Sequence, residues 1–96
     1  MATLIAPQYG QNTDIDATAE RLTLDNIRPT FGIQIKALAA NTDKVYIGYD
    51  NNVLATTGYQ LSAGQEMFIS LAEVQDAYDV WLIGGAANQG VCWRVV

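Results

Sequence analysis

Histidine is absent from this 96-residue sequence, and cysteine occurs only once, as Cys92. Without an imidazole, the chain lacks the general base of Ser–His and Cys–His nucleophile systems and a common ligand of zinc sites. A single thiol excludes both an intrachain disulfide and the spacing of a zinc cluster. We therefore predict that the protein is not an enzyme and uses no metal or other cofactor. Cys92 is expected to be a small residue on a strand.

Catalysis by two carboxylates needs no histidine and has to be weighed separately. It requires one carboxyl group in an apolar pocket that raises its pKa while the other stays ionised. The acidic residues that stand close enough in sequence all fall in predicted loops or at strand edges, where water keeps them ionised. We interpret them as surface residues: Asp14, Asp16, Glu73, Asp76 and Asp79.

Basic residues are also scarce, because ten acidic residues stand against five basic ones and the formal net charge is −5. Binding to nucleic acid or to an anionic membrane draws its affinity from several clustered Lys and Arg side chains. The five here are scattered along the chain: Arg21, Arg28, Lys36, Lys44 and Arg94. We therefore predict neither nucleic acid nor a membrane as a partner. No apolar run approaches the roughly 18 residues that span a bilayer, and we expect synthesis in the cytoplasm without a secretory signal.

Half of the residues are hydrophobic, and they alternate with polar residues along most of the chain. This period of two is typical of half-buried strands. It predicts strands at 21–25, 31–37, 45–49, 53–57, 66–71, 78–83 and 91–96. The strand at 78–83 is apolar on both faces, so we expect both of its sides to be covered. Asn and Asp within 40–43 favour a tight turn, so 31–37 and 45–49 are expected to pair as an antiparallel hairpin. About one helical turn is expected at 72–77.

The first nineteen residues lack this periodicity and are rich in turn and loop formers. We predict an extended N-terminal arm over 1–19, anchored by Leu4, Ile5 and Tyr9, followed by a β-sandwich domain over 20–96. The predicted fold is all-β, an antiparallel β-sandwich or small β-barrel of about seven short strands. A core this small gives a thin stability margin, and the surplus apolar surface favours burial against copies of the same chain or a partner.

Aromatic side chains gather in the second half of the chain. On a β-sandwich they can stack on sugar rings, which makes a carbohydrate-binding module one candidate. However, Tyr49 is expected on the inward face of its strand, and Trp93 alternates with Arg94. Packing in the core or at a subunit interface is therefore the favoured interpretation.

Three segments, in order, carry a resemblance to small structural proteins of tailed-bacteriophage virions. In those proteins an Asn-Thr turn leads into a Val-Tyr-Val/Ile-Gly strand, a Gly-Tyr/Phe-x-Leu segment and Gly-Glu turn follow, and an aromatic-apolar strand then runs into a small-residue loop with Gln. The matching runs are Asn41-Thr42-Asp43-Lys44-Val45-Tyr46-Ile47-Gly48, then Gly58-Tyr59-Gln60-Leu61 with Gly64-Gln65-Glu66, then Trp81-Leu82-Ile83-Gly84 with Gln89-Gly90-Val91. The resemblance covers about residues 41–96.

The resemblance implies a virion component, in particular a capsid decoration (cement) protein. Such proteins look like small, often trimeric β-modules that sit on the outside of the head between capsomers and stabilise it against internal DNA pressure. The implied partners are further copies of the chain, with a trimer favoured, and the major capsid protein, and the implied location is the capsid surface. A tail, connector or head-fibre structural protein remains an alternative. The residues expected to contact other subunits or the capsid are Leu4, Ile5, Tyr9, Tyr46, Tyr59, Trp81 and Trp93.

Overall fold

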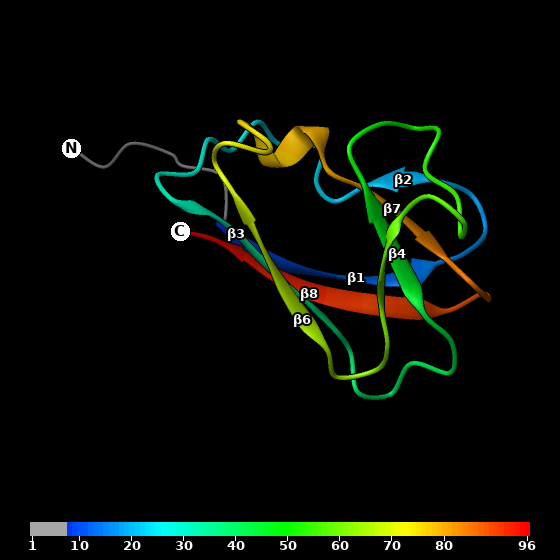
Figure 1. The fold of residues 1–96 in the computed structure, drawn as a ribbon. Coiled ribbons are helices and arrows are strands. Elements are labelled where there is room, and N and C mark those ends of the chain that lie inside the picture. The colour runs from blue at the N-terminus through cyan, green and yellow to red at the C-terminus, as the bar shows by residue number, and fades with distance from the viewer. Residues whose placement is uncertain (1–7) are drawn as a thin grey trace.

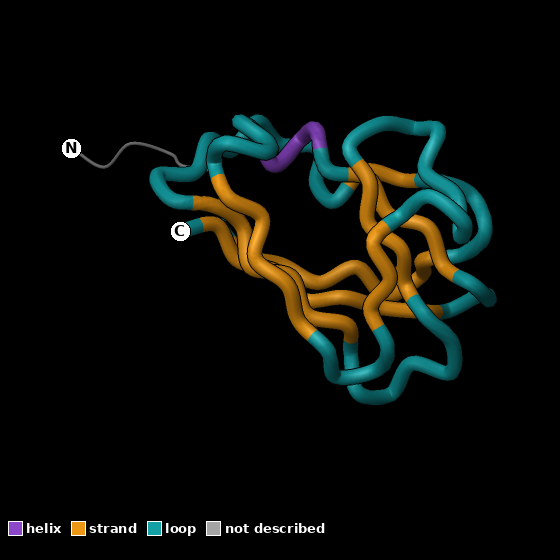
Figure 2. The backbone as a smooth tube through the Cα atoms, in the orientation of Figure 1, coloured by secondary structure: helices purple, strands orange, loops and turns teal. Residues whose placement is uncertain are grey.

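Period-two segments of the chain form two four-stranded antiparallel sheets that pack face to face in the computed structural model, which describes residues 8–96 (Figures 1 and 2). The elements follow in the order β1 (Tyr9–Ile15), β2 (Glu20–Arg21), β3 (Gly32–Ala37), β4 (Val45–Gly48), β5 (Tyr59–Leu61), β6 (Glu66–Ser70), the 3-10 helix η1 (Ala77–Asp79), β7 (Trp81–Gly84) and β8 (Gln89–Val95). Sheet A has the strand order β1-β8-β3-β6, and sheet B has the order β2-β7-β4-β5. The all-β sandwich prediction is confirmed.

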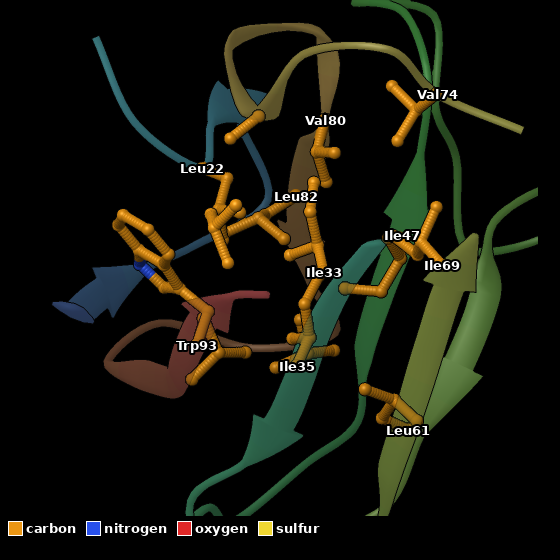
Figure 3. Packing of buried hydrophobic residues seen from close by; sticks show 14 of the residues in the cluster. Leu22, Ile33, Ile35, Ile47, Leu61, Ile69, Val74, Val80, Leu82 and Trp93 are labelled. Atoms are coloured by element: carbon orange, nitrogen blue, oxygen red, sulfur yellow. The ribbon is translucent and has the colours of Figure 1, made fainter. Parts of the chain in front are cut away.

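The core lies between the two sheets and is built from the inward residues of each strand. Ile33 and Ile35 of β3 point from sheet A toward Ile47 and Leu82 of sheet B (Figure 3). Trp93 of β8 closes one side of this cluster, and its indole Nε1–H donates a 3.1 Å hydrogen bond to Asn12 Oδ1. Alternation in 32–37, 45–48 and 66–70 therefore predicted the buried faces correctly, because one face of each strand has to meet the opposite sheet.

The predicted hairpin between residues 31–37 and 45–49 is wrong. β3 pairs with β6 and β8 in sheet A, whereas β4 pairs with β5 and β7 in sheet B. Residues 38–44 are thus a crossover from one sheet to the other. The Asn and Asp that favour a tight turn are present, but Asn41 bonds to Gly90 of β8, and the Asp43 carboxylate accepts the N–H of the next residue, Lys44.

A buried amide holds this crossover in place. Gln89, only 1% exposed, accepts the backbone N–H groups of Thr42 and Asp43 on its Oε1, each at 2.9 Å. Its Nε2 donates to Thr42 Oγ1 and to the carbonyl oxygen of Ala87, again at 2.9 Å. Asn41 adds a reciprocal pair with the backbone of Gly90, with both bonds at 2.8 Å. We call this network the Gln89 clasp.

Part of the segment predicted as an N-terminal arm is a strand of the sandwich. Residues 9–15 form β1, an edge strand of sheet A that pairs with β8 from Tyr9↔Arg94 to Ile15↔Gln89, and Ile15 is fully buried. Backbone pairing with β8 fixes this segment despite its few apolar residues. The rest of the predicted arm, including Leu4 and Ile5, lies outside the described residues.

Three local predictions fail where side chains bond to nearby backbone. The N–H of Leu54 donates to Thr57 Oγ1, so 53–57 forms turns and the strand follows at β5. The N–H of Asp25 donates to Thr23 Oγ1, so β2 ends at Arg21 and Leu24 is 82% exposed. Asp76 caps η1 through a 2.9 Å bond from the N–H of Tyr78, which places helix at 77–79 and delays β7 to Trp81. Such short-range bonds compete with the ladder of a strand.

We predict that replacing Gln89 by Ala lowers the free energy of unfolding by about 2–4 kcal/mol, because the N–H groups of Thr42 and Asp43 lose their acceptor and the buried Gln89 side chain leaves a cavity. Denaturant unfolding monitored by tryptophan fluorescence measures the change. Gln60→Ala is the matched control, since Gln60 is exposed on β5 and its loss should cost no more than about 0.5 kcal/mol. Equal losses in the two variants would show that the clasp does not hold the crossover.

Candidate contact surfaces

The outer face of sheet B is covered by the chain's own β4–β5 connection, residues 49–58. Val53 of this loop is buried against Gly48, where an added Cβ would come within 2.6 Å of the Val53 Cβ. Glycine therefore lets the loop lie directly on β4. Beneath and beside it, Tyr46 is half-buried, and Ile83 of β7, which stands opposite Tyr46, is buried. As expected for 78–83, β7 has both of its faces covered.

The outer face of sheet A presents its side chains in two rows that cross all four strands. Residues in register share a row, so the rows are Tyr9, Arg94, Gln34 and Phe68, then Gln11, Cys92, Lys36 and Glu66. We call these eight residues the sheet A face. Each is exposed or half-buried, with Tyr9 at 73% and Phe68 at 46%. A shallow hollow of about 430 Å³ lies between them.

Two local contacts order the sheet A face on the β6 side. The Phe68 ring lies over Gly32, where any Cβ would collide with the ring and with the carbonyl oxygen of Ile69. The aromatic ring thereby covers a backbone stretch that has no side chain of its own. Gln34 Nε2 donates a 2.8 Å hydrogen bond to Glu66 Oε1, which links the two rows across β3 and β6.

A second hollow, of about 560 Å³, is lined mainly by the end of β4 and the β4–β5 connection, with Tyr59 of β5 and Met67 of β6 at its side. Ile47, Tyr59 and Met67 line its apolar part. β5 pairs only with β4, and β6 pairs only with β3, so each of these strands keeps one unpaired backbone edge. Tyr59 is 61% exposed. We call this the β5–β6 groove.

Tyr49 ties the rim of the β5–β6 groove to the turn after β6. Its hydroxyl donates a 2.8 Å hydrogen bond to Glu73 Oε2. Burial, together with the bond to Glu73 and the charge of that carboxylate, raises the pKa of Tyr49 to about 12. The sequence prediction that Tyr49 faces inward is wrong, because β4 ends at Gly48 and the following loop carries the ring outward.

Arg21 forms a stacked cluster with two aromatic side chains near the start of β7. Its guanidinium lies 3.7 Å from the Tyr78 ring centroid and 4.5 Å from that of Trp81. It also donates a 2.6 Å hydrogen bond to the carbonyl oxygen of Tyr78. This cation–π arrangement joins β2 to η1 and β7, and it occupies one face of the Trp81 ring.

The acidic residues serve mainly local structure. Asp76 Oδ1 accepts the N–H groups of Ile27 and Tyr78, and Glu73 bonds to Tyr49. Burial raises the pKa of Glu20, and the nearby charges of Asp16 and Asp14 raise it further against the opposing effect of an Asn12 hydrogen bond.

Two kinds of site are absent from residues 8–96, a metal centre and a helical membrane span. Within this range, no group of three or more Cys, Asp or Glu side chains is placed to hold a metal ion. No helix in the same range is both long and apolar enough to cross a bilayer.

The structure separates the predicted contact residues into three groups. Tyr9 and Tyr59 are exposed on edge strands, Tyr46 and Trp81 are half-buried within sheet B, and Trp93 is a core residue at 9% exposure. Leu4 and Ile5 lie outside the described residues. Sequence reasoning did not select Phe68, Lys36 or Arg94, although each sits at an outward position of an alternating strand, which is the signal that could have found them.

We predict that Tyr49 ionises near pH 12 in an ultraviolet titration of the folded protein, and that this component is missing in Tyr49→Phe. The folded-state pKa lies above the ordinary value of 10.0. Folding therefore favours the neutral phenol, so its contribution to stability is complete below pH 10.0 and is lost as the pH rises toward about 12. Glu73→Gln should lower the pKa by removing the neighbouring charge, whereas Glu66→Gln should leave it unchanged. A titration that Glu73→Gln does not shift would contradict the assignment.

Comparison with known proteins identifies no relative from which a role for these surfaces could be taken: no family model, no curated protein and no solved structure matches the chain.

Proposed function

We propose that this protein is a structural component of a tailed-bacteriophage virion, namely a capsid decoration protein. In this role it binds the outside of the head between capsomers and bridges neighbouring subunits of the major capsid protein. The bridge opposes the outward pressure of packaged DNA. The protein works through contacts alone and performs no chemistry.

The observation that carries the proposal is the placement of exposed aromatic side chains on edge strands. Tyr9 lies on β1, Tyr59 on β5 and Phe68 on β6, and each of these strands pairs on one side only. Proteins that stay monomeric usually protect such edges with charged residues or proline. Aromatic residues are instead enriched where proteins bind one another. The edges of this sandwich therefore suit a protein that is built into an assembly.

The residues that carry the resemblance to phage proteins act on the fold that the proposal requires. Asn41 and Thr42 from the first matching run bond to Gln89 and Gly90 from the last one, forming the Gln89 clasp. The first and the last matching runs are therefore not independent strand patterns. They meet in one network at the connection between the two sheets, and a sequence sharing both would be expected to share this crossover.

The β5–β6 groove is the surface we assign to the capsid. It combines an exposed tyrosine with an apolar floor formed by Ile47 and Met67, and it adjoins the edge strands β5 and β6. An extended segment of a capsid subunit could add to one of these edges by main-chain hydrogen bonds and insert a side chain into the hollow. The carbohydrate-binding alternative is not proposed, because Trp93 is in the core and Arg21 covers one face of Trp81.

We predict that Tyr59→Ala weakens binding to capsids by about tenfold or more, since a buried aromatic anchor commonly dominates an interface. The assay is co-sedimentation with capsids assembled from the major capsid protein of the same genome. Gln60→Ala is the matched control, because Gln60 neighbours Tyr59 on β5 and is also exposed. Thermal unfolding should be similar for both variants and the unmodified chain.

Two results would count against the proposal. Failure of the unmodified chain to sediment with these capsids would overturn the decoration role. Binding to isolated tail or connector assemblies under the same conditions would then favour the alternative of a different virion component. Equal binding by Tyr59→Ala and Gln60→Ala would remove the β5–β6 groove from the capsid contact.

A further inference from the structure

We infer that the sheet A face docks a second copy of this chain, and that the copy contributes the acidic end of its β1 and β2 strands. These are the surfaces through which the homo-oligomer of the proposed function would assemble. The choice of a second copy as the binding partner rests on that proposed function.

The sheet A face is positively charged on an acidic protein. Lys36 and Arg94 are set against a single acid, Glu66, whose Oε1 already accepts a hydrogen bond from Gln34. The whole chain has ten acids and five bases, so nine acids and three bases remain elsewhere. Tyr9 and Phe68 flank the two basic side chains and supply apolar contact area. A partner surface that fits this face is therefore acidic, with apolar residues beside the acids.

The chain itself carries such a surface where β1 leads into β2. Asp14, Asp16 and Glu20 lie close enough for their charges to interact, and Leu24 is exposed nearby, beside the same surface depression as Asp14 and Glu20. Arg21 is the adjacent base, but its guanidinium is stacked on Tyr78 and Trp81. The repulsion among the three carboxylates contributes to the raised pKa of Glu20, and cationic side chains brought by a neighbouring copy would relieve it.

The two surfaces adjoin along β1, where Gln11 borders both, but their charged residues are different, so the contact between copies is heterologous. A heterologous contact repeats from copy to copy and closes into a ring when the rotation allows it, which is compatible with the trimer favoured above. Sheet B cannot offer the equivalent face, because residues 49–58 cover its outer side. The β5–β6 groove lies at another edge of the sandwich and stays free for the capsid.

The test is sedimentation equilibrium of the full chain over a range of concentrations, at low and at high salt. We expect the unmodified chain to self-associate and the association to weaken with salt, because the charges are exposed. Lys36→Glu with Arg94→Glu should weaken association at least ~10-fold, since like charges would then face each other. Asp14→Lys with Glu20→Lys should do the same. Asp16 is kept because its Oδ1 accepts the N–H of Thr18.

Two further variants make the test specific. Combining all four substitutions in one chain reverses both surfaces and should restore association to within a few-fold of the unmodified chain. Arg28→Glu with Lys44→Glu changes the net charge as much as Lys36→Glu with Arg94→Glu but lies outside both surfaces, so it should leave association unchanged. Circular dichroism and thermal unfolding check that each variant is folded.

The inference is overturned if the unmodified chain is monomeric at every concentration, if the Arg28/Lys44 control weakens association equally, or if the fourfold variant fails to recover. These results are distinguishable from failure of the proposed function. A monomeric chain that still sediments with capsids overturns only the docking of a second copy. A chain that forms a ring but does not sediment with capsids overturns only the decoration role.

Discussion

The side-chain amide of Gln89 is the constraint on which the architecture depends. Consecutive strands usually pair with each other, yet β3 and β4 belong to different sheets. The crossover between them has no facing strand to accept its backbone N–H groups, so a side chain or water has to accept them. Gln89 meets that need with one oxygen that accepts two N–H groups and one nitrogen that donates twice. The crossover leads from β3, which lies between β8 and β6 in sheet A, to β4, which lies between β7 and β5 in sheet B.

This strand order decides which surfaces the protein can use. β5 and β6 are both edge strands and are joined by only residues 62–65, so Tyr59 and Met67 both reach the β5–β6 groove, whose remaining wall is β4 and the β4–β5 connection. The long β4–β5 connection has to return to that edge and does so across the outer side of sheet B. Sheet A has no comparable loop on its outer side among residues 8–96, so its two rows of side chains remain accessible. The strand order thus explains both why the outer face of sheet A is accessible and why the outer face of sheet B is covered.

Many of the buried strand residues could be predicted from the sequence alone, but the pairing of the strands could not. The inward residues of 32–37, 45–48 and 66–70 follow from alternation, because a strand side chain either meets the core or does not. The alternation of apolar and polar residues does not indicate which strands pair with each other. The hairpin predicted between 31–37 and 45–49 is wrong for that reason. β1 escaped notice because its stability comes from backbone pairing with β8 and from Asn12 bonding to Trp93, not from apolar residues. Among the residues of the contact surfaces, Tyr9 and Tyr59 are predicted from the sequence. Lys36 and Arg94 are not, because only the register of β3 with β8 brings these two residues together.

The residues that suggested a phage protein turn out to act on the fold. Asn41, Thr42 and Gln89 are engaged with one another and with backbone, and within residues 8–96 no buried side-chain nitrogen or oxygen lacks a hydrogen-bond partner. Two proteins that share this crossover can share these residues even when their outer surfaces bind different partners. The function therefore has to be argued from side chains that the fold does not use, namely the edge aromatics and the basic pair on the sheet A face. A relative that kept the clasp but replaced these residues by small polar ones would be expected to fold alike and bind differently.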